Sequence, residues 1–472
     1  MQIRIKSLTN IFLMAFVVPT YASDTQYSVG SLNKPMTGIA LARLVDVGKI
    51  DLDGPVITYV ANPEYTNSFN GGVAENISKK DTNADQCEKA RSKKPDETAA
   101  ILARFESGVI ARMERGQDNP VRHTIAARLA HHQVPGAAVA IIRDGEIWAI
   151  RGYGTRLAGT EAPIGPDTVF SAGSISKIVN AALILRLVNE GVLDLDADVN
   201  DYLQRWHVPA SEFTADTPVT LRAIMSHTAG FSVHGFRDYN PGEELPTVIE
   251  TLNGTGPALN DPVVLEFAPG TGFAYSGGGV TVSQALIEDV TGLGYEQAAR
   301  RYVFAPLGMT RSTFANPLPA SHGDIAHAHD EYGAPAALPR GWEAMPELAA
   351  SGLWTSANDL ARLVIALNDS ARGDGAFLPA RLAADMMSRV PGSWHGLGPR
   401  LNGVGATRVF HHGGANNSYR SWMEGHLDSG DGIVILTNGT DGHWIYTELR
   451  KSAADALGWP IHSDGGFEEP EF

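Results

Sequence analysis

Apolar residues fall into short runs that predict separate strands and helices. In AAVAIIRDGEIWAIRGYG (137–154), two apolar runs flank an Asp-Gly pair, which supplies the positive φ angles of a tight hairpin. The stretch YRSWMEGHLDSGDGIVILTNG (419–439) repeats this order, with two strands around a Gly-rich turn. A last helix is expected at roughly 442–457.

Residues 98–133 carry two helical patterns, TAAILARFESGVIARMERG and PVRHTIAARLAHH. Val121 belongs to the apolar face of the second pattern, and Asn119 before Pro120 predicts where this helix begins. The long stretch between the two predicted hairpins is rich in helical patterns and loops. These patterns predict an α/β (α+β) fold in which an antiparallel sheet, built from both chain ends, is flanked by helices and carries a large helical insertion.

The first 22 residues have the pattern of a secretory signal peptide. Arg4 and Lys6 provide the positive start, an apolar run ends at Val18, and Ala22 is the small residue expected at a cleavage point. The apolar run is too short to span a bilayer comfortably, so we expect no membrane association beyond this segment. The pattern predicts a periplasmic or secreted protein.

Four segments follow from these patterns. They are a signal peptide (1–22), a partial repeat (23–60), a flexible linker (61–97) and the main domain (98–460). The linker is polar and nearly devoid of large apolar residues.

Composition excludes several partners. The chain has 37 Lys and Arg against 53 Asp and Glu, a net charge of −16, whereas nucleic acids and anionic membranes bind clustered basic residues. Cys87 is the only cysteine, so neither an intrachain disulfide nor a metal–thiolate cluster can form. We expect no metal and no cofactor, and the sequence leaves the oligomeric state open.

One segment of the chain occurs twice. Residues 24–59 and 167–202 match at 15 of 36 positions without a gap, and both carry Ser-x-x-Lys before a helix-like run. In the second copy these residues are Ser174 and Lys177. Three residues apart on a helix, they share a face, so the Lys amine can reach the Ser hydroxyl.

A serine hydroxyl becomes a good nucleophile when a neighbour takes its proton, and a desolvated Lys can do this. The run 178–188 predicts a helix that begins near Ser174 and ends at Gly191. An isolated Ser-x-x-Lys more often marks a capping Ser and a solvated Lys, so the pattern needs further support.

That support comes from other motifs in the same order. They are FSAGSISK, LRAIMSHTAGF (221–231), FAPGTGFAYSGGG (267–279), FAPLGMTRSTF (304–314), SGLWTSANDLARL (351–363) and FHHGGANNSYRSW (410–422). Over about 120–458 the chain resembles the serine β-lactamase and penicillin-binding-protein superfamily. The similar branch holds class C β-lactamases, D-alanyl-D-alanine carboxypeptidases, D-aminopeptidases and related esterases. The resemblance implies a β-lactamase/transpeptidase-like fold.

The resemblance also implies catalytic roles. Ser174 would be the nucleophile and Lys177 its activating partner, while Tyr275 would act as the general base that also protonates the leaving group. His412 would orient Tyr275 and the carboxylate or carbonyl of the substrate. The reaction implied is acyl transfer to Ser174, followed by hydrolysis of the acyl-enzyme.

Substrate-binding groups are implied in the same way. The backbone N–H groups of Ser174 and Ala415 would form an oxyanion hole. Gly414 and Gly277 occupy positions in the substrate-binding motifs, and both mark departures from the family pattern. Tyr-x-Asn appears here as Tyr275-Ser276-Gly277, and His412-Gly413-Gly414 stands in place of Lys-Thr-Gly.

Because Gly cannot donate the side-chain hydrogen bond of Asn, these departures favour D-amino-acid peptides or esters over β-lactams. The sequence therefore predicts a serine hydrolase of D-alanyl carboxypeptidase-like or esterase type. A β-lactamase and a penicillin-binding or peptidoglycan-sensing module without turnover remain alternatives. The expected partner is a small-molecule or peptidoglycan-derived substrate.

The first copy lacks the other parts of such a site. There is no His between residues 24 and 118, and Tyr65-Thr66-Asn67 follows Ser31 by only 34 residues, against 101 between Ser174 and Tyr275. Independent catalysis by Ser31 is therefore not expected. The copy can be a relic of duplication, a docked helix or a piece that completes a neighbouring molecule.

Two further histidine patterns are expected to be structural. His227 in SHTAGF is predicted to bond within a turn. His327 and His329 have a spacing that could chelate a metal, but no further ligand cluster accompanies them, which favours a polar loop.

Overall fold

The computed structural model describes residues 97–460. The predicted signal peptide, the first copy of the repeat with Ser31, and the predicted linker up to residue 96 lie outside these residues. From Ala99 onward, the described residues belong to one compact unit.

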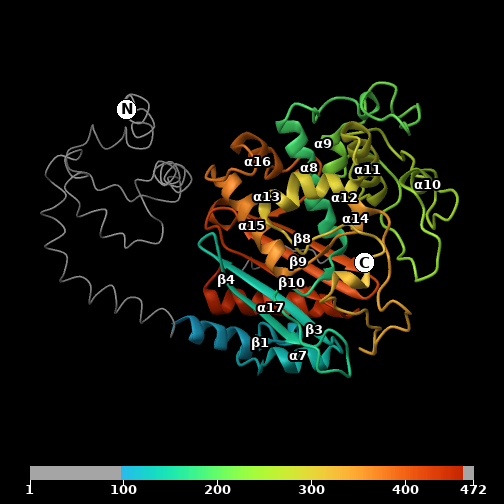
Figure 1. Cartoon of the computed structure of the whole chain (residues 1–472). Coiled ribbons are helices and arrows are strands. Elements are labelled where there is room, and N and C mark those ends of the chain that lie inside the picture. The colour runs from blue at the N-terminus through green and yellow to red at the C-terminus, as the bar shows by residue number, and fades with distance from the viewer. Residues whose placement is uncertain (1–96, 461–472) are drawn as a thin grey trace, which may run out of the picture. The chain divides into compact units, whose positions relative to one another are not determined.

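A six-stranded antiparallel sheet forms the centre of this unit (Figure 1), with the order β4-β3-β10-β9-β8-β7. The strands are β3 (Gly136–Arg143), β4 (Glu146–Gly154), β7 (Arg400–Asn402), β8 (Val409–Asn416), β9 (Tyr419–His426) and β10 (Gly432–Thr437). Strand β3 pairs along its length with β10, so both ends of the domain contribute to one sheet. This confirms the predicted fold class.

The first hairpin turns where the sequence predicts it. Asp144 and Gly145 have φ angles of 54° and 76°, the left-handed region that a tight turn between β3 and β4 requires. Beyond β4 the chain leaves the sheet and returns to it only at β7. The intervening residues form the predicted helical insertion.

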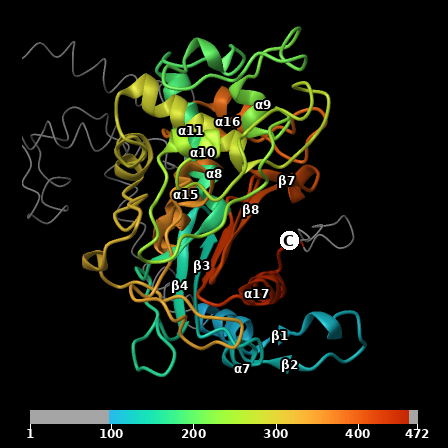
Figure 2. The ribbon, with the colours of Figure 1, turned by 90° about the vertical axis from the view of Figure 1, so that its right-hand side faces the viewer.

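Helices cover both faces of the sheet. Ala137, Val139 and Ile141 of β3 pack with α7 (Ile125–His131) and α17 (Gly442–Leu457). The alternate residues of β3 belong to the larger core that contains α8 (Ser176–Asn189) and α15 (Ala357–Arg372). Figure 2 shows α7 and α17 on one side of the sheet, with α8 and α15 on the other. Because both faces are buried, β3 is a continuous apolar run.

The insertion contains most of the remaining elements. Its helices are α9 (Leu221–Met225), α10 (Val248–Asn253), α11 (Gly277–Thr291), α12 (Tyr295–Ala299), the π-helix η6 (Arg300–Phe304), α13 (Ala305–Leu307), α14 (Leu348–Ser351), α16 (Ala380–Met386) and the 3-10 turns η4 (Gly173–Ile175), η5 (Val199–Asp201) and η7 (Ala320–His322). Two short strands, β5 (Phe170–Ser171) and β6 (Trp354–Thr355), pair with each other.

The two helices predicted at 98–133 are confirmed only in part. The first helix ends at 107 rather than continuing to 116. The next residue, Gly108, fits this ending because a Cβ there would lie 2.3 Å from the Arg104 carbonyl oxygen. The chain then forms β1 (Val109–Ile110) and the 3-10 turn η3 (Arg112–Glu114). The predicted helix start at Asn119 and Pro120 is wrong.

The second helix, α7, instead begins after Thr124, whose side chain accepts a hydrogen bond from the Ala127 N–H. The residues before it form β2 (Arg122–His123), which pairs with β1. Val121 is therefore 57% exposed and does not belong to a buried helix face.

Two further observations concern residues 97–460. No helix in this range is both long and apolar enough to cross a membrane. Within the same range, no group of three or more His, Cys, Asp or Glu residues is arranged to hold a metal ion.

A 3-10 turn, η8 (Gly405–Thr407), links β7 to β8.

Candidate active site

Ser174 lies in the turn η4, directly before α8. This placement follows from the apolar run 178–188, whose residues are buried, and from Gly191, which has φ 72° just beyond the helix end. The predicted helix and its end are confirmed. Ser174 is thus at the N-terminal end of a buried helix, the end whose dipole favours an anion.

Gly173 brings strand β8 against this turn. Its φ is +52°, and a Cβ there would lie 2.6 Å from the backbone nitrogen of Ala415. A Cβ at Gly414 would lie 2.0 Å from the carbonyl oxygen of Ala172. Both contacts need glycine, because any side chain would push the two backbones apart. Ala415 and Gly414 therefore lie beside the Ser174 turn, although more than 200 residues separate them in sequence.

Lys177 is held one helical turn after Ser174. Its Nζ donates to Ser174 Oγ at 3.2 Å and to the Ala350 carbonyl of α14 at 2.8 Å. The side chain is buried, so these two oxygen atoms fix its position. The Ser-x-x-Lys pair is therefore in hydrogen-bonding contact, as its spacing predicts.

Tyr275 completes this group from the N-terminal side of α11. Lys177 Nζ lies 4.9 Å from the centre of its ring, and the Arg400 guanidinium lies 5.9 Å from the same ring. The next residue, Ser276, caps α11 by accepting the Gly279 N–H. The Ser276 N–H in turn donates to His227 Nδ1 at 3.1 Å. His227 thus positions the Tyr275 segment. Its role is structural, as predicted, but its ring bonds to this distant segment and not within its own turn.

Gly277 has no room for the asparagine of the family pattern. A Cβ at this position would lie 3.0 Å from the Phe236 ring and 3.2 Å from the His234 carbonyl oxygen. The Gly277 N–H donates to that same carbonyl at 3.0 Å. The space beside Tyr275 is therefore occupied by the loop that carries Phe236.

Four imidazole rings surround Tyr275. The ring centres of His227, His234, His395 and His412 lie 4.3, 4.9, 6.0 and 6.2 Å from the Tyr275 ring centre. Burial lowers the pKa of His395 to about 3, and the charges of Arg400 and Lys177 contribute. Burial likewise holds the pKa of His227 and of His412 well below the usual value. These three buried rings are uncharged at neutral pH.

Two of these rings have a defined tautomer. His412 Nδ1 lies 2.6 Å from the Gly413 carbonyl oxygen, and His395 Nδ1 lies 2.9 Å from the Gly398 carbonyl oxygen. A carbonyl oxygen can only accept, so each Nδ1 carries the proton and each Nε2 presents a lone pair. Both Nε2 atoms are buried without a hydrogen-bond partner in the described part of the chain.

His395 and Arg400 were not predicted from the sequence. They face each other across an isolated antiparallel bridge, where a turn leads into β7 at Arg400. The Arg400 side chain makes no hydrogen bond or ion pair with any residue in 97–460. The stretch SWHGLGPR contains no motif used in the sequence analysis, although a histidine and an arginine five residues apart in a Gly-rich turn could have signalled a site.

Three buried carboxyl groups flank the site. Asp238 accepts the Asn417 N–H at 2.7 Å, Glu343 accepts the Ser418 hydroxyl at 3.1 Å, and Glu347 has no partner for either oxygen among the described residues. Burial raises the pKa of Asp238 to about 7 and that of Glu347 to about 8. Glu347 precedes α14, the helix that binds Lys177.

His329 is hydrogen-bonded within the protein through both ring nitrogens. His329 Nδ1 lies 2.8 Å from the Asn438 carbonyl oxygen, and His329 Nε2 accepts the Ala158 N–H at 3.0 Å. Both nitrogens are therefore used inside the protein. The predicted structural role of this loop is confirmed for His329.

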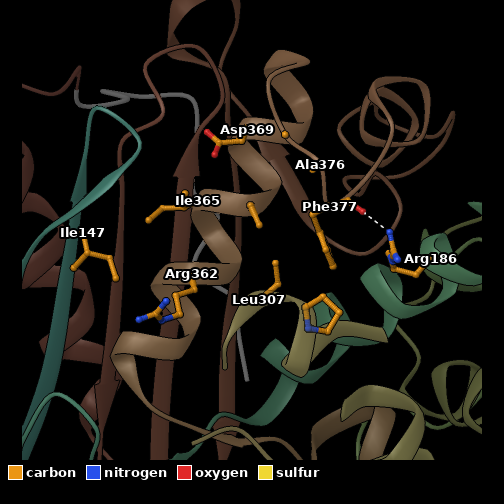
Figure 3. A pocket seen from close by; sticks show the side chains of 11 residues that line it. Ile147, Arg186, Leu307, Arg362, Ile365, Asp369, Ala376 and Phe377 are labelled. Atoms are coloured by element: carbon orange, nitrogen blue, oxygen red, sulfur yellow. Dashed lines mark hydrogen bonds between the residues drawn. The ribbon is translucent and has the colours of Figure 1, made fainter. Parts of the chain in front are cut away.

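A separate pocket lies between α8, α13 and α15 (Figure 3). Arg186 Nη1 donates to the Phe377 carbonyl at its edge at 2.9 Å. The lining residues are Ile147, Arg186, Pro306, Leu307, Arg362, Ile365, Ala366, Asp369, Gly375, Ala376 and Phe377. None of the candidate catalytic residues is among them, so this pocket is distinct from the Ser174 site.

The site geometry agrees with a known family. Residues 18–85 and 121–458 match the family model described as Beta-lactamase. The chain belongs to the beta-lactamase family. The matched range 18–85 includes the first copy of the repeat, outside the described residues.

Members of the beta-lactamase family with different activities are similar to this chain. Penicillin-binding protein 4 of Amycolatopsis lactamdurans is 29% identical over 70% of this chain and 88% of its own length. Esterase EstB of Burkholderia gladioli is 29% identical over 54% of this chain and 70% of its own.

Solved structures share the fold. The D-amino acid amidase of Ochrobactrum anthropi SV3 superposes with a TM-score of 0.55 at 21% identity, covering 71% of this chain and 96% of the amidase. Together with the family match, these similarities identify the protein as a serine hydrolase of the β-lactamase and penicillin-binding-protein superfamily.

Proposed function

We propose that the protein hydrolyses D-amino-acid peptide or ester bonds through an acyl-enzyme on Ser174, as a D-alanyl carboxypeptidase-like enzyme or an esterase. The observation that carries this proposal is the 3.2 Å contact between Lys177 Nζ and Ser174 Oγ, with the Tyr275 ring 4.9 Å from the same Nζ. A nucleophile in hydrogen-bonding contact with one acid–base group, and a second acid–base group beside it, can perform both halves of acyl transfer.

The first half forms the acyl-enzyme. Ser174 Oγ bonds to the substrate carbonyl carbon while its proton passes to the Lys177 and Tyr275 pair. The carbonyl oxygen becomes negatively charged and accepts hydrogen bonds from the N–H groups of Ser174 and Ala415. The bond to the leaving group then breaks, and Tyr275 supplies the proton that the leaving group takes.

In the second half, water replaces the leaving group. The same pair removes a proton from water, the hydroxide adds to the acyl carbon, and Ser174 Oγ leaves with the returned proton. The products are a free acid and the restored enzyme. Each group thus returns to its starting protonation state.

The surroundings of Tyr275 favour peptides or esters over β-lactams. Phe236 occupies the space beside Gly277 where a side-chain amide would stand. A substrate carboxylate needs a positively charged partner, and the uncharged His412 presents only a lone pair at Nε2. Arg400, whose side chain has no ionic partner within 97–460, can supply that charge. The similarity to an esterase supports ester substrates.

Labelling tests the site. Fluorescent penicillin and a fluorophosphonate are expected to label the wild type and Ser31→Ala but not Ser174→Ala. Labelling that persists in Ser174→Ala would overturn the assignment of the nucleophile. The matched Ser31→Ala variant distinguishes the two copies of the repeat.

Turnover distinguishes the alternatives. Release of D-alanine from a D-alanyl-D-alanine peptide, or cleavage of short-chain p-nitrophenyl esters, supports the proposal. Rapid nitrocefin cleavage would identify a β-lactamase instead. A stable penicilloyl-enzyme without turnover of any of these substrates would identify a penicillin-binding or peptidoglycan-sensing module.

The proposed location follows from the chain's first residues. Residues 1–22 have the pattern of a signal peptide, which supports a periplasmic or secreted enzyme acting on peptidoglycan-derived or other small substrates. Cell fractionation with an antibody against the catalytic domain tests this. Retention of the whole protein in the cytoplasm would contradict it.

A further inference from the structure

The pocket between α8, α13 and α15 (Figure 3) is an accessible cavity that the proposed hydrolysis does not use. Its volume is about 490 Å³, within the range of sites that hold small organic molecules. Arg362 and Ala376 belong to its lining and have exposed side chains, so a ligand can enter from solvent. The chemistry of the lining therefore indicates what the pocket can bind.

One face of α15 provides an apolar wall. Arg362, Ile365, Ala366 and Asp369 all line the pocket, and their spacing of three, four and seven residues places them along one stripe of the helix. Leu307 of α13 adds a further apolar side chain. Ile365, Ala366 and Leu307 are only partly buried, so the pocket leaves apolar surface that a ligand can cover.

Two arginines give the same pocket a positive charge. The Arg362 side chain makes no hydrogen bond or ion pair with any residue in 97–460. Arg186 donates from Nη1 to the Phe377 carbonyl, while its Nε is buried without a hydrogen-bond partner in the same range. A guanidinium carries several N–H donors, so both arginines retain donors for a ligand.

Asp369, the acidic residue in this lining, does not neutralise the arginines. Its Oδ1 forms an ion pair with Arg372 Nη2 at 2.6 Å. Figure 3 shows Asp369 at one end of the pocket, apart from Arg186 and Arg362. The lining thus offers two guanidinium groups without an ionic partner and one carboxylate that already has one. An anionic group complements it.

A ligand that satisfies both features joins an apolar body to an anionic group. We propose that the pocket binds an amphipathic carboxylate, whose charged group pairs with the lining arginines and whose hydrocarbon chain covers the apolar face of α15. A guanidinium can hold a carboxylate through two parallel N–H···O bonds. The chain gains free energy by leaving water. The proposal does not rest on the proposed function, because no candidate catalytic residue lines the pocket.

Isothermal titration of the full chain tests the ligand class, with octanoate as the probe. Octanoate is expected to bind saturably, with one molecule per chain. Butanoate should bind more weakly, by about 4-fold for each buried methylene that it lacks. Octan-1-ol lacks the charge, inorganic phosphate lacks the chain, and octyltrimethylammonium has the opposite charge. Each should bind at least about 10-fold more weakly than octanoate.

Variants of the lining test the place of binding. Arg362→Gln is expected to weaken octanoate binding by about 10-fold to 100-fold, because it removes a charged donor that has no structural partner. Ala376→Trp should abolish binding by filling the pocket from its exposed rim. Arg381→Gln changes an exposed arginine of α16 outside the lining and is the matched control, with the wild-type affinity expected. Thermal unfolding verifies that each variant is folded.

Three results would overturn the proposal. The first is no saturable octanoate binding by the wild type up to about 5 mM. The second is equal affinity for octanoate and octan-1-ol, which would show that the arginines do not recognise the ligand. The third is wild-type affinity in folded Arg362→Gln, which would place the octanoate elsewhere. Because binding is measured without turnover, each result is independent of the activity of Ser174.

Discussion

His227 Nδ1 accepts the backbone N–H of Ser276 at 3.1 Å, and the carbonyl of His227 accepts the N–H of Ala274. These two hydrogen bonds hold the residues on both sides of Tyr275. The φ angle of His227 is 60°, a backbone conformation that non-glycine residues seldom adopt. His227 therefore fixes the Tyr275 segment through both its ring and its backbone.

Substituting His227 is expected to separate these two contributions. His227→Ala loses the acceptor for the Ser276 N–H, which should lower the free energy of unfolding by about 1 to 3 kcal/mol. The misplaced Tyr275 should lower kcat/KM by about 10-fold to 100-fold. His227→Asn, which tolerates positive φ and offers an acceptor oxygen, should lose less of both. Thermal unfolding and steady-state kinetics measure these effects, and equal losses in the two variants would contradict this account.

Gly173→Ala is expected to disable the oxyanion hole. The new Cβ would lie 2.6 Å from the backbone nitrogen of Ala415, so β8 must move away from Ser174. Losing one oxyanion donor lowers the rate by about 10²-fold to 10³-fold. The matched control is Gly191→Ala, which has a similar positive φ but no atom within 4 Å of its Cβ.

Labelling of Ser174 by a fluorophosphonate measures the effect of this change. Gly191→Ala should cost about 1 to 2 kcal/mol of stability through its backbone conformation and leave the labelling rate intact. If the two alanine variants label at the same rate, the close approach of β8 is unimportant for acylation.

Restoring the family asparagine is expected to destabilise the protein. In Gly277→Asn the Cβ would lie 3.0 Å from the Phe236 ring, and such overpacking costs about 1 to 3 kcal/mol. Adding Phe236→Ala should relieve the contact, so the double variant should be more stable than the two single effects predict. Denaturant unfolding of the four proteins gives the coupling free energy, and additive effects would show that Phe236 does not restrict this position.

Glu347 is expected to make stability depend on pH. Burial raises its pKa from 4.5 to about 8, so between these values the folded protein holds a proton that the unfolded chain releases. The free energy of unfolding therefore falls as the pH rises from about 5 to 8. Asp238, whose pKa burial raises to about 7, contributes in the same direction.

Glu347→Gln removes the carboxyl group that takes up one of these protons on folding. The variant should be close to the wild type at pH 5 and more stable at pH 8, by on the order of 2 to 4 kcal/mol. The exposed Glu331→Gln is the matched control and should leave the pH dependence unchanged. A Glu347→Gln curve parallel to the wild type from pH 5 to pH 8 would mean that this carboxyl group does not bind the proton on folding.

Much of the architecture could be predicted because it depends on local signals. The Asp-Gly turn, the apolar runs of the strands and the Gly191 helix end each act over a few residues. The contact between Ser174 and Lys177 follows from helix geometry alone. The break at Gly108 was missed because the apolar pattern continues past it, while the strand that follows the helix is stabilised by pairing with a strand further along the chain.

The outer part of the site could not be predicted in this way. His395 and Arg400 come close to Tyr275 only because a turn between α16 and β8 packs on the catalytic helix, a contact over more than 200 residues. The protonation of the imidazoles depends on burial and on their mutual proximity, which no spacing expresses. The motifs thus point to the proposed reacting groups, and tertiary packing determines their surroundings.

The pairing of β3 with β10 has a consequence for biosynthesis. During translation Ser174 and Lys177 emerge long before Ala415, and the β3–β4 hairpin must wait for β10 to find its neighbour in the sheet. A nascent chain therefore carries the proposed nucleophile, Ser174, without the second proposed oxyanion donor, Ala415, until the last strands have been made. The proposed site is therefore complete only after the whole domain has been synthesised.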